Sequence, residues 1–133
     1  MSRENVEVVR RATDAYNRGA LEEAAKWMDP EIEWDMSRVE VPDPDVYRGV
    51  DGMLAFHRSW EESWESQDLE PQELIEAGDQ VVSVIRHVGR GKLSGAEVEQ
   101  RFAQLWTVRD GKIVRMEMYP DREDALEAVG LPE

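Results

Sequence analysis

The stretch EVEQRFAQLWTVRDGKIVRMEMY, residues 97–119, decides the fold. Polar and apolar side chains alternate along residues 97–108 and again along 112–119, which is typical of strands. Between the two segments lies Asp110-Gly111, a dipeptide that favours a tight hairpin turn. The stretch therefore predicts two long antiparallel strands joined by a short turn.

The same alternation predicts two more strands just before this hairpin, at residues 73–77 and 80–88. Gly78-Asp79 marks the turn between them, and the glycine-rich segment 89–95 connects them to the long hairpin. This segment is not expected to bind phosphate, because its glycine spacing differs from the nucleotide motifs and it joins two strands instead of opening a helix. Four successive strands with short connections predict an antiparallel meander.

Outside the meander, apolar residues recur at three- and four-residue steps, as they do in helices. The predicted helices span residues 2–18, 20–28, 49–65 and 121–129. A short strand at 31–35 and a proline-bearing loop at 36–48 separate the second helix from the third. Segregated helices and strands indicate a single α+β domain over residues 1–133, with a curved antiparallel sheet around helices. Such a sheet encloses a cone, and we expect an internal pocket in it.

The composition excludes several classes of function. The net charge of −14 argues against nucleic acid, because phosphate binding needs a basic face. No segment approaches the roughly 20 apolar residues of a membrane span, and the first residues lack the apolar core of a signal peptide. Cysteine is absent, so we expect a cytoplasmic protein without disulfides. Two scattered histidines fit no ligand pattern, and neither a metal nor another cofactor is expected.

Five short segments spread over the chain carry a family resemblance. They are AYNRG at 15–19, MDPEIEW at 28–34, YRG at 47–49, DGKI at 110–113 and ALEAVGL at 125–131. In these segments the chain resembles the NTF2-like superfamily, and its SnoaL-like, ketosteroid isomerase-related branch in particular. The resemblance implies the cone-shaped fold with its pocket and a homodimer formed through the outer face of the sheet. It implies no single reaction, because the superfamily includes isomerases, cyclases, dehydratases and non-catalytic binding domains.

Asp35 is the candidate general base. Proteins resembling the ketosteroid isomerases place their catalytic carboxylate at this point, and an apolar cavity raises the basicity of a carboxylate. In the isomerases a tyrosine and a protonated aspartate form an oxyanion hole beside this base. The tyrosine corresponds to Ala12 and the aspartate to Gln104, so this chain does not reproduce that oxyanion hole. Tyr16, one turn further on, and the Gln104 amide are the candidate hydrogen-bond donors. The alternative is that Asp35 begins a loop and accepts from a nearby backbone N–H.

By the same resemblance, the inward strand faces and the aromatic side of the third helix line the cavity. The expected ligand-binding residues are Trp34, Phe56, Trp60, Gln100, Phe102, Trp106, Val114, Met116 and Met118, with Gln104 on the same strand face. Two amides among aromatic and thioether groups suit a mostly apolar ligand with one or two polar atoms. The alternative is that the tryptophan and methionine side chains simply fill the core.

The two histidines are secondary candidates. Either could pair with Asp35, as in dehydratases of the superfamily, and a capping or partly exposed role is the alternative for each. His57 borders the aromatic side of the third helix. His87 is expected to point outward, because the other face of its strand, with Val82 and Val84, is more apolar. Arg86 is expected to pair with a surface carboxylate, with a clamp for a bound carboxylate or enolate as the alternative.

Three functions are consistent with these residues. The first is a cofactor-independent isomerase, cyclase or dehydratase that acts on a small apolar carbonyl compound. The second is a non-catalytic pocket that binds such a compound. The third is a structural domain that only dimerises, through the outward residues of the long strand. Those outward residues are Glu99, Arg101, Ala103, Leu105 and Thr107.

Overall fold

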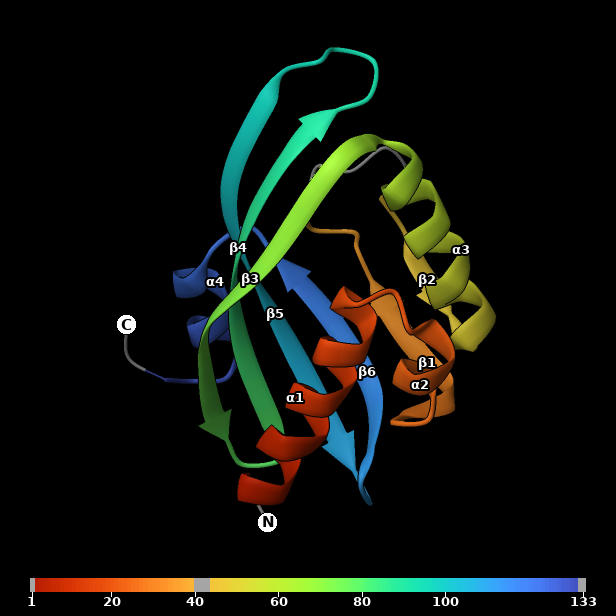
Figure 1. The fold of residues 1–133 in the computed structure, drawn as a ribbon. Helices are drawn as coiled ribbons and strands as arrows, with labels where there is room; N and C mark the ends of the chain where they lie inside the picture. The colour runs from red at the N-terminus through yellow and green to blue at the C-terminus, as the bar shows by residue number, and fades with distance from the viewer. Residues whose placement is uncertain (1, 40–43, 132–133) are drawn as a thin grey trace.

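The computed structural model of the chain describes residues 2–39 and 44–131. Its helices are α1 (Ser2–Asn17), α2 (Leu21–Ala25), α3 (Gly49–Glu62) and α4 (Arg122–Ala128). Its strands are β1 (Met28–Asp35), β2 (Val46–Arg48), β3 (Trp64–Ala77), β4 (Gln80–Gly91), β5 (Glu97–Arg109) and β6 (Lys112–Tyr119). The predicted α+β class is confirmed, with helices first and a four-stranded meander after them (Figure 1). No described helix is long and apolar enough to span a membrane.

The strands form one curved, open sheet in the order β2-β1-β6-β5-β4-β3 (Figure 1). Strands β3 to β6 pair antiparallel with their neighbours along the chain, as predicted. Strand β1 instead runs parallel to β6, with Trp34 opposite Met116, so the expectation of a wholly antiparallel sheet is wrong at this pair. The reason is that α3 and the meander lie between β1 and β6, and no hairpin imposes antiparallel pairing on them.

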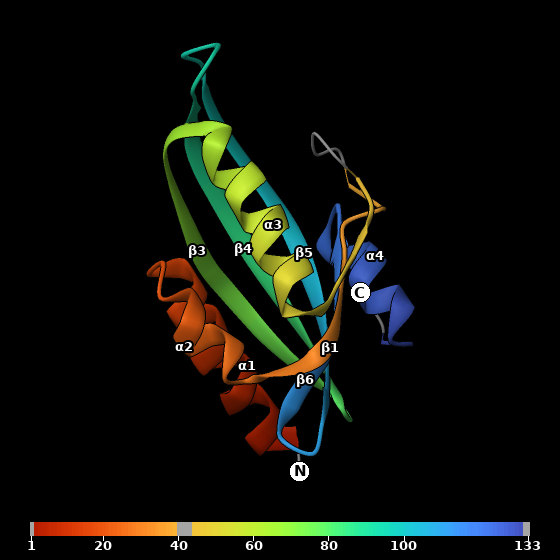
Figure 2. The same cartoon turned by 90° about the vertical axis from the view of Figure 1, so that its right-hand side faces the viewer.

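Helices cover both faces of the sheet. Helices α1, α2 and α3 lie on one face, the inner face, and α4 lies on the opposite, outer face (Figure 2). Side chains of β5 point alternately to the inner and the outer face. Trp106 therefore packs in a core on the inner face and Leu105 in a second core on the outer face. The outer core is made by Val82, Ala103, Leu105, Ala125 and Leu126. Two residues of the expected dimer surface, Ala103 and Leu105, are thus covered by α4 of the same chain; dimerisation itself stays a prediction.

Strand β3 is much longer than predicted. The sequence placed residues 64 and 65 in the third helix and began the strand at 73, whereas α3 ends at Glu62 and β3 begins at Trp64. None of the β3 side chains is fully buried, because β3 is an edge strand, and the apolar alternation is therefore weak. Pro71 fits there because an edge strand tolerates a missing N–H, and the register shifts just after it.

Strand β2 lies within the segment that was predicted as a loop. Its three residues pair antiparallel with the end of β1, Asp35 opposite Val46. Gly49 follows β2 directly and has a φ of +73°, and a Cβ there would lie 3.2 Å from the carbonyl oxygen of Pro30. A glycine is therefore required at this turn, which sends the chain from β2 into α3. The second predicted helix is shorter than expected, because Met28 already belongs to β1.

Candidate functional site

A cavity of about 400 Å³ lies between the helices and the inner face of the sheet. Its wall combines α1, the end of β1 and the segment after it, α3, and strands β3 to β6. The lining residues are Thr13, Tyr16, Asn17, Trp34, Met36, Arg38, Val39, Phe56, Trp60, Leu69, Ile85, Gln100, Arg101, Phe102, Gln104, Trp106, Met118 and Pro120. The tryptophans therefore line the space without filling it.

Aromatic side chains hold one another in the cavity wall. Tyr16 of α1 stacks on Trp34 of β1 with ring centroids 5.6 Å apart. Trp34 meets Trp106 of β5 edge to face at 5.7 Å, and Phe56 stacks on Trp60 within α3 at 6.3 Å. Rings at these separations attract one another beyond the area that they bury, and each is fixed by a neighbour from another element or turn. Much of the wall therefore consists of aromatic rings that support one another.

A few polar groups interrupt this wall. Gln104 lines the cavity, and its Oε1 is buried without a hydrogen-bond partner among the described residues. The indole nitrogens of Trp34 and Trp106 are likewise buried without a hydrogen-bond partner among the described residues. Burial first, and then the charge of Glu61, raise the pKa of Tyr16 above its usual value, so its phenol stays protonated and can donate a hydrogen bond. Unpartnered buried polar atoms are costly, and a bound water or ligand is the usual explanation for them.

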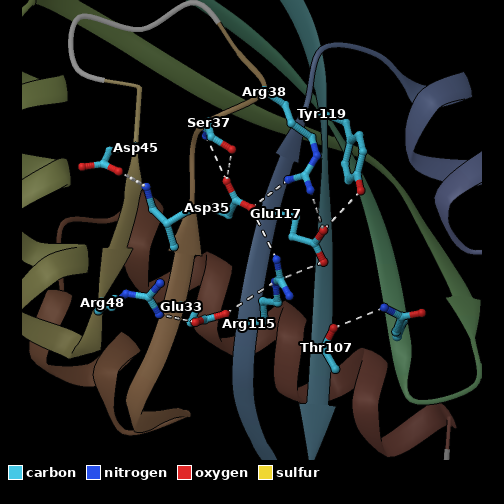
Figure 3. Close-up of polar contacts among 12 residues, drawn as sticks. Glu33, Asp35, Ser37, Arg38, Asp45, Arg48, Thr107, Arg115, Glu117 and Tyr119 are labelled. Carbon is cyan, nitrogen blue, oxygen red and sulfur yellow. Dashed lines mark hydrogen bonds and ion pairs between the residues drawn. The ribbon is translucent and has the colours of Figure 1, made fainter.

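Asp35 does not line this cavity. Its neighbours Trp34 and Met36 do, and alternation along the strand turns Asp35 to the outer face. There its Oδ1 accepts from the backbone N–H and the hydroxyl of Ser37, at 3.0 and 2.6 Å (Figure 3). Its Oδ2 lies 2.8 Å from Nη1 of Arg38. This is the loop-starting arrangement that was the alternative to a general base.

The surroundings of Asp35 favour its ionised form. Burial raises the pKa of Asp35, but the hydrogen bonds from Ser37 and the charge and hydrogen bond of Arg38 outweigh it and lower the pKa to about 2. A carboxylate with this pKa accepts a proton poorly at neutral pH. The structure thus places Asp35 where it fastens the end of β1, while a general-base role stays a prediction without support from this geometry.

Asp35 belongs to an ion-pair network made by Glu33, Asp35, Arg38, Arg115 and Glu117 (Figure 3). Of these residues, Arg38 also lines the cavity. Arg115 of β6 reaches Asp35 at 3.4 Å and Glu117 at 3.4 Å. Arg38 reaches Glu117 at 3.5 Å and lies over the ring of Tyr119, 5.0 Å from its centroid. The network was not predicted, although Glu33 and Asp35 alternate on β1 as Arg115 and Glu117 do on β6. Knowing that β1 pairs with β6 would have revealed it.

His57 lies beside the cavity wall and not in it. Its ring contacts that of Tyr16 edge to face at 4.8 Å, and its Nε2 is 3.3 Å from Oε2 of Glu61, one turn further along α3. The candidate pairing of His57 with Asp35 is absent from the described contacts, because Asp35 faces the other side of the sheet. Nor do the described residues contain a group of three or more metal-ligating side chains.

His87 points inward, and the prediction that it points outward is wrong. It is 0% exposed, and the rings of Trp60, Trp64 and Phe102 lie 5.1, 4.6 and 6.2 Å from it. The prediction failed because α4 covers the outer face of β4, so an apolar outer face was mistaken for the inner one. Burial lowers the pKa of His87, which favours the neutral imidazole. Arg86 lies on the outer side and pairs with Glu70 and Glu99, the salt-bridge alternative that was expected.

The three predicted residues of β6 occupy different places. Met118 lines the cavity, whereas Met116 is fully buried in the inner core beneath it. Val114 borders a polar recess that Thr107 and Arg115 also line, so its prediction as a cavity residue is wrong. The pairing of β5 with β6 shifts between Thr107 and Val108, and this bulge turns Val114 to the outer side. The other predicted wall residues, listed next, all line the cavity: Trp34, Phe56, Trp60, Gln100, Phe102, Gln104 and Trp106.

Comparison with known proteins identifies the family and the fold of the chain. The sequence model of the family described as the SnoaL-like domain matches residues 9–116. Among solved structures, TerC, co-crystallised with polyporic acid, is 26% identical with a TM-score of 0.77, and the match covers 95% of this chain and 98% of that one. An NTF2-like protein from Burkholderia thailandensis E264 is 27% identical with a TM-score of 0.78, covering 96% and 98%. An NTF2-like protein from Burkholderia xenovorans LB400 is 24% identical with a TM-score of 0.77, covering 98% of each chain, and supports the fold alone. A search of the curated proteins finds no match.

Proposed function

The chain belongs to the family of SnoaL-like domains, and on that premise we propose that it binds a small, mostly apolar organic molecule in the inner cavity. The observation that carries the proposal is the wall, in which aromatic rings from α1, α3, β1 and β5 surround a space of about 400 Å³. Clefts of roughly 300–1,000 Å³ with apolar walls and a few polar groups are typical of small-molecule sites.

The polar groups of the wall narrow the ligand further. Gln100, Gln104 and Tyr16 can each make a hydrogen bond without carrying a charge at neutral pH. A flat molecule with one or two oxygen atoms would satisfy these groups and stack on the rings of Trp34 and Phe102. TerC, the relative co-crystallised with polyporic acid, supports a small organic ligand for this chain as well.

Acid/base catalysis on such a ligand is the second candidate. It is favoured by the partly buried Tyr16, whose phenol stays protonated and could donate to a carbonyl oxygen inside the cavity. A base role for Asp35 would require this carboxylate to leave Arg38 and turn to the other face of the sheet. We therefore propose binding as the function, with isomerisation, cyclisation or dehydration as a further step that needs a substrate to be found.

Calorimetric titration with polyporic acid tests the proposal. The Leu69→Trp variant adds a large side chain to the cavity wall, and Leu74→Trp adds the same side chain on the same strand outside the lining. We expect the wild-type chain and Leu74→Trp to bind the compound, and Leu69→Trp to bind it at least tenfold more weakly. Equal binding by both variants, at equal thermal stability, would show that the compound binds elsewhere. No binding by the wild-type chain would count against this class of ligand.

A further inference from the structure

Four side chains form one hydrogen-bonded chain that ends in the cavity wall. Nε1 of Trp60 lies 2.8 Å from Oε1 of Gln67, and the same oxygen lies 3.0 Å from Nε2 of His87. Nδ1 of His87 then lies 3.0 Å from Nε2 of Gln100. Trp60 belongs to α3, Gln67 to β3, His87 to β4 and Gln100 to β5, so the chain of bonds crosses four elements.

The chemistry of these groups gives every bond one direction. An indole N–H can only donate, so the Gln67 atom that faces Trp60 is its carbonyl oxygen. That oxygen can only accept, and therefore Nε2 of His87 carries a proton. A neutral imidazole with its proton on Nε2 has a bare Nδ1, which must accept from the amide NH₂ of Gln100. The indole of Trp60 thus sets the orientation of the Gln100 amide through two intervening side chains, Gln67 and His87.

The surroundings of His87 keep its imidazole neutral. The groups that face it are Trp60 from α3, Trp64 and Gln67 from β3, and Gln100 and Phe102 from β5. All of them are uncharged, and the imidazole is 0% exposed. Burial without a carboxylate partner lowers the pKa of His87. The direction of the hydrogen bonds therefore holds at neutral pH.

Gln100 has its amide nitrogen toward His87, and the two ends of an amide point apart. Gln100 lines the cavity and is itself exposed, so its carbonyl oxygen is the end left free to accept from a ligand. We propose that Gln100 is a specificity-determining hydrogen-bond acceptor, and that the cavity selects planar molecules that carry a hydroxyl group over the same molecules without a donor. His87 is its positioning residue, since it holds the amide without reaching the ligand itself. The inference rests on the proposed binding function and adds the chemical class of the ligand.

A matched pair of compounds tests the selectivity. 2-Naphthol and 2-methoxynaphthalene share one ring system and differ in whether the oxygen can donate. We expect the intact chain to bind the naphthol more tightly, by roughly three- to tenfold, as for one hydrogen bond made or lost. The preference should fall clearly in Gln100→Leu, with Gln104 left as the remaining acceptor in the wall, and persist in full in Gln80→Leu, because Gln80 lies outside the cavity and bonds to Thr107. Equal affinity of the wild-type chain for both compounds would overturn the inference and leave the binding function intact.

Nitrogen NMR of His87 tests the orientation without any ligand. We expect the spectrum of the free chain at neutral pH to show the neutral tautomer with its proton on Nε2. A proton on Nδ1, or on both nitrogens, would overturn the inference whatever the titrations give. If the tautomer is as expected but neither naphthalene compound binds, the proposed function fails and the selectivity inference fails with it. Since the ratio of two affinities is measured in each variant, a general loss of stability would not imitate the expected result.

Discussion

The Oδ2 atom of Asp35 lies 2.8 Å from the guanidinium of Arg38, on the outer face of the sheet, while Trp34 just before it lines the cavity. Along β1, Trp34 thus belongs to the cavity wall and Asp35 to an ion pair, whose other member, Arg38, also lines the cavity. The side chain of Asp35 is 4% exposed and that of Arg38 is 38% exposed, so the pair is partly shielded from water. This placement predicts a role in stability for Asp35.

The Asp35→Asn variant should be less stable but still bind ligand. Removing the charge takes from Arg38 and Arg115 one of the two anions that they share, Glu117 being the other, which should cost about 1–3 kcal/mol in the free energy of unfolding. Urea unfolding measures this loss. The matched change Glu97→Gln removes an exposed pair with Arg90 and should cost less than about 0.5 kcal/mol. If the variant were as stable as wild type but had lost ligand binding or turnover, Asp35 would have a role in the ligand site instead.

The stabilisation by Asp35 should depend on pH in a defined window. Its pKa is about 2 in the folded chain against a usual value of 3.8, so the unfolded chain takes up the proton first as pH falls. The contribution is therefore present above about pH 4 and is lost as pH falls toward 2, at most about 2 kcal/mol in all. The difference in unfolding free energy between wild type and Asp35→Asn should shrink between pH 6 and pH 2.5. A constant difference would contradict the ion pair.

Replacing Gln104 with leucine should separate binding from stability. Its Oε1 is buried without a partner in the part of the chain that the structure describes, so an apolar side chain of similar size removes an unsatisfied group. We expect the unfolding free energy to stay within about 1 kcal/mol of wild type or to rise. Affinity for polyporic acid should fall several-fold. Gln80→Leu, outside the cavity, is the control and should leave affinity unchanged, whereas an equal fall in both variants would contradict a ligand role for Gln104.

Gly89 makes room for the aromatic cluster around His87. A Cβ at this position would lie 2.8 Å from Cε3 of Trp64, closer than packed atoms allow. Gly89→Ala should therefore destabilise the chain by about 1–3 kcal/mol through displacement of the Trp64 ring. In a Trp64→Leu background the same change should cost clearly less, and a double-mutant cycle measures the difference. Additive effects of the two substitutions would show that the ring is not what Gly89 accommodates.

Much of the fold followed from local patterns. Strands β4 to β6 were predicted to within a few residues, because apolar side chains alternate along them and Asp110-Gly111 fixes the turn. Strand β3 was largely missed, since an edge strand buries too little for a clear pattern. The parallel pairing of β1 with β6 could not be predicted locally, because it joins segments about 80 residues apart, as the separation of Asp35 from Arg115 shows.

The candidate site was predicted in part, and its failures have a common cause. The inward residues of β5 lie in the wall as the period of two required, from Gln100 to Trp106. His87 and Val114 were assigned to the wrong side, the first because α4 covers the outer face and the second because of the bulge near Thr107. The partners of Asp35 were hidden by the same long-range pairing that brings Arg115 to it. Each error arose where tertiary contacts, and not the sequence period, determine the face.

A crystal structure of the chain soaked with polyporic acid tests the central claim most directly. We predict density for the compound in the inner cavity, against the rings of Trp34 and Phe102 and within hydrogen-bond distance of Gln100 or Gln104. Asp35 should remain bound to Arg38 on the outer face. A cavity closed by the chain's own side chains, or the compound bound at another surface while this space stays empty, would contradict the account.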